Sequence, residues 1–313
     1  MTIAEPSRFD PELRQHLVEL SRVELWDLDQ VRLGTVASAL EWDPSVRVTS
    51  FTVPGAAGAP DVPVRLYDGR LSSRDHDGVL HVHGGAFVSG SPDFEHRRSM
   101  YLARGARCLV VSVDYRLAPE HRYPAGFEDC CAALDWMTGA AGELGIDPRR
   151  VGVAGSSAGG CLAAALALRG RNGDGPPVAF QLLVYPALDC RCSSPSMRRF
   201  SDIPGFSGRN ASQMWSLYLP EGGGADAYAS PALASALAGL PPAFVSVAEF
   251  DPLRDEGIDF ALRLLGSSVA VELRVFPGTW HGFDLVAPGT AAALSFERAE
   301  VDALRRLVGT LAG

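Results

Sequence analysis

The chain has 313 residues, 47% of them hydrophobic and 21% charged, with a formal net charge of −9 at pH 7. This composition is typical of a globular protein with a sizeable core, organised as one domain with an appendage or as two domains. The acidic balance argues against nucleic acid or an acidic membrane surface as the main partner. Because the sequence shows neither a charged-then-apolar leader nor an apolar run of membrane-spanning length, we expect a cytoplasmic protein.

The first forty or so residues differ in pattern from the rest of the chain. Leu13, Leu17 and Leu20 fall on one helical face, and the stretch Asp27–Leu40 predicts a second short helix. We expect both segments to cover an apolar surface formed by the rest of the chain.

From about residue 46 onward the pattern is one of strands separated by Gly, Pro and Asp turns. Val46–Val53 and Val62–Tyr67 alternate in polarity and indicate an antiparallel start to a sheet. Helical patterns such as Phe127–Met137 and Gly257–Leu265 lie between most of the later strands, so the sequence predicts a doubly wound α/β sheet. These later strands are short, mostly continuous apolar runs, as expected for strands covered on both faces: Gly78–Val82, Cys108–Val113, Val151–Ala154, Phe180–Tyr185, Ala243–Ala248 and Val271–Phe276.

A glycine pair follows the strand predicted at Gly78–Val82, within His83-Gly84-Gly85-Ala86-Phe87. The backbone N–H groups of Gly84 and Gly85 are unhindered, and such groups can stabilise the oxyanion of a tetrahedral intermediate. Two adjacent glycines commonly form only a turn. Their position, one strand–helix–strand unit before the next motif, favours the functional interpretation.

That next motif, Gly155-Ser156-Ser157-Ala158-Gly159, lies between a predicted strand and a helical pattern. It matches a nucleophile elbow, a strained strand-to-helix turn that exposes the hydroxyl of its central serine. The flanking glycines suit a backbone too tightly turned for a Cβ. Ser156 is the rival nucleophile, but a motif centred on it would have alanines at both flanks. We therefore predict Ser157 as the nucleophile and the N–H of Ala158 as a third oxyanion donor.

A serine hydroxyl needs a base that takes its proton and an acid that orients this base. In α/β hydrolases the acid and then the histidine follow the serine along the chain. Of the seven histidines only His281 lies downstream of Ser157, on a glycine-flanked loop after the last predicted strand. His281 is therefore the predicted base, and an ordinary surface histidine is the alternative.

Four carboxylates, Glu249, Asp251, Asp255 and Glu256, follow the strand predicted at Ala243–Ala248. The proline after Asp251 restricts this residue to extended or turn geometry, which suits a loop at the end of a strand. Asp255 and Glu256 resemble carboxylates in the first turn of a helix. We predict Asp251 as the acid, with Glu249 as the alternative.

Residues from about 190 to 224 carry no strand pattern but are rich in aromatic side chains. We interpret residues 1–45 and 190–224 as a helical cap over the carboxyl edge of the sheet, and residues 46–189 and 225–313 as the catalytic domain. An ordinary long connection is the alternative, although loops of this length are uncommon. The aromatic residues are Phe200, Phe206, Trp215 and Tyr218.

With these motifs the chain resembles the hormone-sensitive-lipase-like (bacterial family IV) carboxylesterases of the α/β-hydrolase fold. The resemblance implies a mostly parallel eight-stranded sheet flanked by helices, a helical cap, and a homodimer formed through the last strand. Two positions depart from the family pattern, since Ala86 replaces a third glycine and Ser156 stands where the family often has Asp or Thr. The matching motifs run from about Gly78 to Phe283: His83-Gly84-Gly85-Ala86-Phe87, Asp114-Tyr115-Arg116-Leu117-Ala118-Pro119-Glu120, Tyr123-Pro124-Ala125, Gly155-Ser156-Ser157-Ala158-Gly159-Gly160, Tyr185-Pro186, Ser230-Pro231, Asp251-Pro252-Leu253-Arg254-Asp255-Glu256 and His281-Gly282-Phe283.

We therefore predict a serine carboxylic-ester hydrolase, without metal or cofactor, that acts on short- to medium-chain acyl esters of small molecules. Ser157 attacks the acyl carbonyl, His281 transfers the proton and Asp251 orients the imidazole, while an acyl-enzyme forms and is then hydrolysed. Two alternatives stay open. One is another acyl hydrolase with the same triad, namely an amidase, formamidase or lactonase, and the other is a non-catalytic ligand-binding receptor on this fold.

Overall fold

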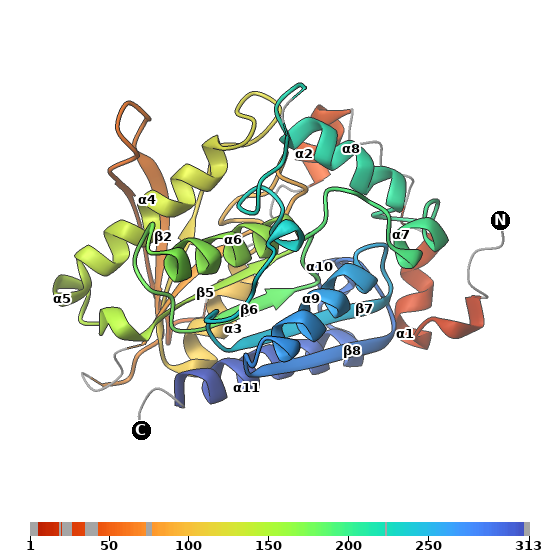
Figure 1. The fold of residues 1–313 in the computed structure, drawn as a ribbon. Coiled ribbons are helices and arrows are strands. Elements are labelled where there is room, and N and C mark those ends of the chain that lie inside the picture. Colours follow the sequence, from red (N-terminus) through yellow and green to blue (C-terminus); the bar gives the residue numbers. More distant parts are fainter. Residues whose placement is uncertain are drawn as a thin grey trace.

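The computed structural model describes residues 6–18, 20, 27–34, 43–72, 77–222 and 224–309. Eight strands in these residues form one sheet in the order β1-β2-β4-β3-β5-β6-β7-β8 (Figure 1). β2 pairs antiparallel with β1 and β4, and all other neighbours are parallel, which confirms the predicted α/β-hydrolase type of sheet. The strands are β1 (Arg47–Val53), β2 (Val62–Asp68), β3 (Gly78–Val82), β4 (Leu109–Val113), β5 (Val151–Ser156), β6 (Gln181–Val184), β7 (Ala243–Phe250) and β8 (Val271–Trp280).

Helices cover both faces of the sheet, and each face has its own apolar core. Successive strand residues point to opposite faces, so Leu80 belongs to one core and its neighbour Val79 to the other. The first core is completed by α4 (Ala125–Gly139), α6 (Ala158–Asn172) and α9 (Arg254–Gly266), and the second by α3 (His96–Ala106) and α11 (Ala291–Gly309). Burial on both faces explains why the central strands are continuous apolar runs.

The remaining helices are short, with the exception of α8. None of the helices in the described part of the chain combines the length and apolarity needed to cross a bilayer. They are α1 (Pro11–Arg14), α2 (Leu28–Gly34), α5 (Ala141–Leu144), α7 (Pro195–Arg199), α8 (Gly208–Tyr218) and α10 (Phe283–Val286), with 3₁₀ helices at Pro6–Arg8, Gln15–Val18, Pro148–Arg150 and Pro231–Leu233.

The N-terminal prediction differs from the structure in its details. Instead of one helix carrying three leucines, α1 passes into the 3₁₀ helix Gln15–Val18, a common ending for a short helix. Leu13 is nevertheless buried, and Leu17 and Leu20 pack against the same apolar core. The helix expected at Asp27–Leu40 is present as α2, and its residues 35–40 lie outside the described part of the chain.

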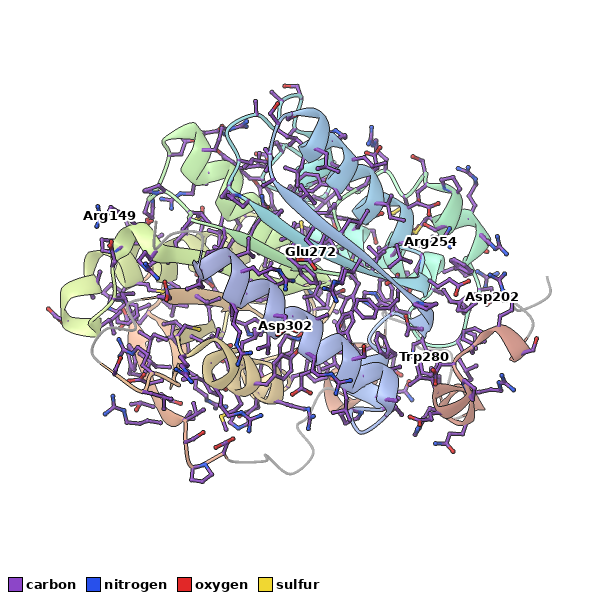
Figure 2. All side chains as sticks on the ribbon, turned by 90° about the horizontal axis from the view of Figure 1, so that it is seen from below. Arg149, Asp202, Arg254, Glu272, Trp280 and Asp302 are labelled. Atoms are coloured by element: carbon purple, nitrogen blue, oxygen red, sulfur yellow. The ribbon has the colours of Figure 1, made fainter. Side chains whose placement is uncertain are left out.

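The N-terminal segment lies at the carboxyl edge of the sheet. Phe9, just before α1, packs against Phe250 at the end of β7 and Trp280 at the end of β8, with ring centroids 4.3 and 6.1 Å apart. Figure 2 shows Trp280 from below, beside the turn that follows β8. No strand interrupts the described residues between 190 and 222, which contain α7 and α8, and Figure 1 shows α8 and α2 at the same end of the molecule. The division into a cap and a catalytic domain stays a prediction.

Candidate active site

Three parallel strands carry the predicted triad residues to one edge of the sheet. Ser157 follows the last residue of β5, Asp251 follows β7, and His281 follows β8. The carboxyl ends of parallel strands meet at the same edge, where α/β proteins bind their ligands. Residues separated by 124 positions in the sequence thereby come into contact.

Ser157 occupies the strained turn that the sequence pattern predicts. Its backbone lies at φ 54° and ψ −118°, between β5 and the first residue of α6. A Cβ on Gly155 would lie 2.2 Å from the carbonyl oxygen of Gly159, and one on Gly159 would lie 2.0 Å from that of Val82. Because contacts this short do not occur for real Cβ atoms, only glycine fits at either flank of the serine.

A chain of hydrogen bonds joins the three side chains. The Ser157 hydroxyl lies 2.9 Å from Nε2 of His281, and Nδ1 of the same ring lies 2.8 Å from Oδ2 of Asp251. A carboxylate only accepts hydrogen bonds, so Nδ1 carries the proton and Nε2 remains free to accept one. Asp251 is fully buried and the His281 side chain is only 11% exposed. The imidazole is therefore held in the tautomer that a general base for the serine requires.

The other carboxylates near the end of β7 do not reach the imidazole. Glu249 accepts a hydrogen bond from the N–H of Gly278 at 2.9 Å. Asp255 and Glu256 lie in the first turn of α9, as their sequence position predicts. Burial raises the pKa of Glu256 well above its ordinary value, although two backbone N–H groups oppose this shift. Among these four carboxylates, only that of Asp251 lies against the histidine.

The loop after β3 reaches the same edge, but one predicted oxyanion donor is already occupied. The N–H of Gly84 donates to Oε1 of the buried Glu95 at 2.9 Å, which argues against the predicted role of Gly84 as an oxyanion donor. Gly85 and Ala86 follow with φ of 117° and 56° and line the cleft. Within the described residues, nothing accepts a hydrogen bond from the N–H of Gly85, Ala86 or Ala158. These three groups are free to bind an anion.

A cleft of about 530 Å³ opens above the serine, and its wall is mostly apolar. Leu20 and Val31 reach it from the N-terminal segment, Phe206 and Asn210 from the segment containing α8, and Leu285 from α10. Both parts of the predicted cap thus contribute to the wall that surrounds the candidate nucleophile. A partly enclosed apolar cleft with few polar groups suits a small organic ligand.

Two aromatic rings enclose His281, and sequence analysis predicted neither contact. The ring centroids of Tyr185 and Phe206 each lie 4.7 Å from that of the imidazole. The Tyr185 hydroxyl lies 3.0 Å from Nη2 of Arg98 and 3.0 Å from Oδ1 of Asp284. Burial raises the pKa of Tyr185 well above its ordinary value, so the hydroxyl keeps its proton. These contacts restrict the ring of His281 to the orientation that faces the serine.

The chain belongs to the α/β-hydrolase family, whose signature, described as "alpha/beta hydrolase fold", matches residues 79–285. This membership confirms the resemblance to hormone-sensitive-lipase-like carboxylesterases, and the protein is a carboxylesterase-type hydrolase. It is 39% identical to carboxylesterase NlhH of Mycobacterium tuberculosis, over 93% of this chain and 94% of that protein.

Solved structures resemble nearly the whole chain, among them two esterases. A bacterial heroin esterase superposes with a TM-score of 0.90 at 40% identity, over 96% of this chain and 98% of the other. Esterase LipW of Mycobacterium marinum superposes with a TM-score of 0.83 at 39% identity, over 97% of each chain. The comparisons therefore agree on ester hydrolysis as the activity class.

Proposed function

We propose that the cleft hydrolyses carboxylic esters by nucleophilic catalysis through Ser157. The observation that carries this proposal is the continuous hydrogen-bonded chain from the Ser157 hydroxyl through His281 to Asp251. Nucleophile, base and orienting acid are in hydrogen-bond contact, as acyl transfer by a serine requires.

In the first half of the reaction, Oγ of Ser157 attacks the acyl carbonyl carbon while Nε2 of His281 takes the hydroxyl proton. Asp251 stabilises the imidazolium that forms. Collapse of the tetrahedral intermediate breaks the bond to the alcohol oxygen, which receives the proton from His281. In the second half, water attacks the acyl-enzyme with the same histidine as base, and the carboxylic acid leaves.

The negative charge of the tetrahedral intermediate is assigned to the N–H groups of Gly85, Ala86 and Ala158. Support comes from their position at the cleft and from the absence of acceptors for them among the described residues. Ala158 is the first residue of α6, where N–H groups have no acceptor within the helix and the helix dipole favours negative charge. Gly84 is excluded because its N–H already binds a carboxylate.

The proposed substrates are esters with a short to medium acyl chain. Leu20, Val31 and Phe206 bound the cleft on the side of the predicted cap. Each acyl methylene gains about 0.8 kcal/mol of transfer free energy while it fits and costs strain once it does not, which places the optimum at roughly four to eight carbons. A cap over the serine also excludes water and strengthens the oxyanion hydrogen bonds.

A panel of p-nitrophenyl esters of increasing acyl length tests the proposal, with anilides and lactones of matched acyl groups as competitors. We expect kcat/KM to pass through a maximum at short to medium chains, and the Ser157→Ala variant to give the background rate. A rate that keeps rising to long chains would contradict the bounded cleft. Faster turnover of the anilide or lactone would instead favour the amidase or lactonase alternative.

A further inference from the structure

A buried carboxylate lies beneath the oxyanion loop, here defined as residues 83–90. Glu95 immediately precedes α3, and its side chain is fully buried. Oε1 accepts a hydrogen bond from the N–H of Gly84 at 2.9 Å and a second, short one from the hydroxyl of Ser156. Oε2 lies 3.2 Å from Nε2 of His81 and 3.2 Å from Nε of Arg98. The two oxygens thus face different neighbours.

The surroundings keep this carboxyl group charged. Burial by itself would raise the pKa of Glu95, but Arg98, His81 and Ser156 outweigh burial and hold the pKa well below its ordinary value. A hydrogen bond to an ionised acceptor is roughly twice as strong as one between neutral groups. The bond from Gly84 to Glu95 is therefore a strong constraint on the start of the oxyanion loop.

Oε1 of Glu95 also connects the two chain segments that carry the oxyanion donors. Gly84 directly precedes the loop donors at Gly85 and Ala86, whereas Ser156 lies two residues before Ala158. The segments approach closely, since a Cβ on Gly84 would lie only 2.8 Å from the hydroxyl oxygen of Ser156. A single carboxylate oxygen thus accepts from both segments, which directly follow or end the paired strands β3 and β5.

We propose that Glu95 is a positioning residue for the oxyanion hole, which sets the distance between the loop donors and Ala158 through its bonds to Gly84 and Ser156. The proposal rests on the proposed function, in which Ser157 forms the acyl-enzyme.

If Glu95 only neutralised the buried Arg98, its role would be the same as that of Glu300, a second buried carboxylate bound to this arginine. Nη1 of Arg98 donates to Oε1 of Glu300 at 2.8 Å, and Glu300 accepts a further bond from the hydroxyl of Tyr101 at 2.7 Å. Glu300 is as buried as Glu95 but makes no contact with Gly84 or Ser156. Glu300→Gln is therefore the matched control for Glu95→Gln.

The test measures kcat and KM for a short p-nitrophenyl ester and the inhibition constant of a trifluoromethyl ketone, whose hemiketal oxygen occupies the oxyanion hole. Removing one oxyanion donor costs about 10²–10³-fold in kcat in other enzymes, and displacing donors that remain present should cost about 10–100-fold. An amide has only one acceptor oxygen, so in Glu95→Gln the NH₂ group must face either the N–H of Gly84 or the Nε–H of Arg98, and the side chain shifts. We expect Glu95→Gln to lose kcat and ketone affinity by the same factor with little change in KM. Glu300→Gln should keep the wild-type kcat and ketone affinity.

A double variant tests whether the carboxylate itself is what matters. In Glu95→Gln/Ser156→Asp the new carboxylate at position 156 again places a negative charge near the N–H of Gly84. We therefore expect kcat and ketone affinity to recover in part. No recovery, or equal losses in Glu95→Gln and Glu300→Gln, would overturn the positioning role. If Glu95→Gln does not fold, Ser156→Ala removes one of the two bonds to Oε1, and wild-type ketone affinity in that variant would also overturn it.

The same preparations separate this inference from the proposed function. Ser157→Ala, with Glu95 unchanged, should abolish turnover whether or not Glu95 positions the oxyanion hole. Full activity of Ser157→Ala would refute the proposed function, whereas full activity of Glu95→Gln with an inactive Ser157→Ala would refute only the positioning role.

Discussion

Replacement of Asp251 by Asn tests the triad through a detail of its geometry. The two carboxylate oxygens have separate donors, since Oδ1 accepts from the N–H of Leu253 at 2.8 Å and Oδ2 faces Nδ1 of His281 at 2.8 Å. An Asn side chain has only one acceptor oxygen. Because the backbone N–H of Leu253 can only donate, the amide oxygen stays against it and the NH₂ group faces the imidazole. Nδ1 must then accept, and the ring proton moves to Nε2.

An imidazole protonated at Nε2 cannot take the proton of Ser157, so the variant keeps its fold but holds the wrong tautomer. The equivalent change in a serine protease lowers kcat by about 10⁴-fold, or roughly 5.5 kcal/mol of activation free energy, and we expect a loss of this order. Steady-state kinetics with a p-nitrophenyl ester measure it, and circular dichroism checks the fold. Glu249→Gln, at the end of the same strand, is the control and should retain activity. A loss below tenfold in Asp251→Asn, or a larger loss in Glu249→Gln, would refute this assignment of the acid.

Two further predictions concern His281 and Glu300. Because His281 transfers the proton of Ser157, His281→Ala should lose most of the rate in steady-state assays, and wild-type turnover by a folded His281→Ala variant would contradict the role of the histidine. Burial raises the pKa of Glu300 from 4.5 to about 7, although the charge of Arg98 opposes this shift. Protonation of Glu300 therefore adds to the free energy of unfolding below about pH 4.5, and this contribution is lost as the pH rises through about 7. Over that interval the free energy of unfolding of the wild type relative to Glu300→Gln should fall by on the order of 3 kcal/mol in denaturant titrations, and a pH-independent difference would contradict the shift.

The features that sequence analysis predicted well depend on local patterns and on chain order. The continuous apolar runs predicted the buried strands correctly, because helices cover both faces of the sheet. The elbow at Ser157 could be predicted because its flanking glycines are required by contacts with backbone a few residues away or on the neighbouring strand. His281 followed from its position after the serine, and the structure brings it to 2.9 Å from the serine oxygen.

The features that sequence analysis missed depend on side chains that fold back from a distance. The N–H of Gly84 seemed free in the sequence, because no local pattern indicates that Glu95, eleven residues later, turns its carboxylate under the loop. The contacts of Phe206 and Tyr185 with the imidazole likewise arise only when three separate segments meet at the sheet edge. Spacing along the chain carries no signal for such contacts.

The nucleophile is tested most directly by labelling with a fluorophosphonate followed by peptide mapping. The account predicts one adduct, on Ser157, and neither labelling nor turnover in a folded Ser157→Ala variant. An adduct on the neighbouring Ser156, whose hydroxyl is bonded to Glu95, would contradict the account, as would wild-type turnover by Ser157→Ala.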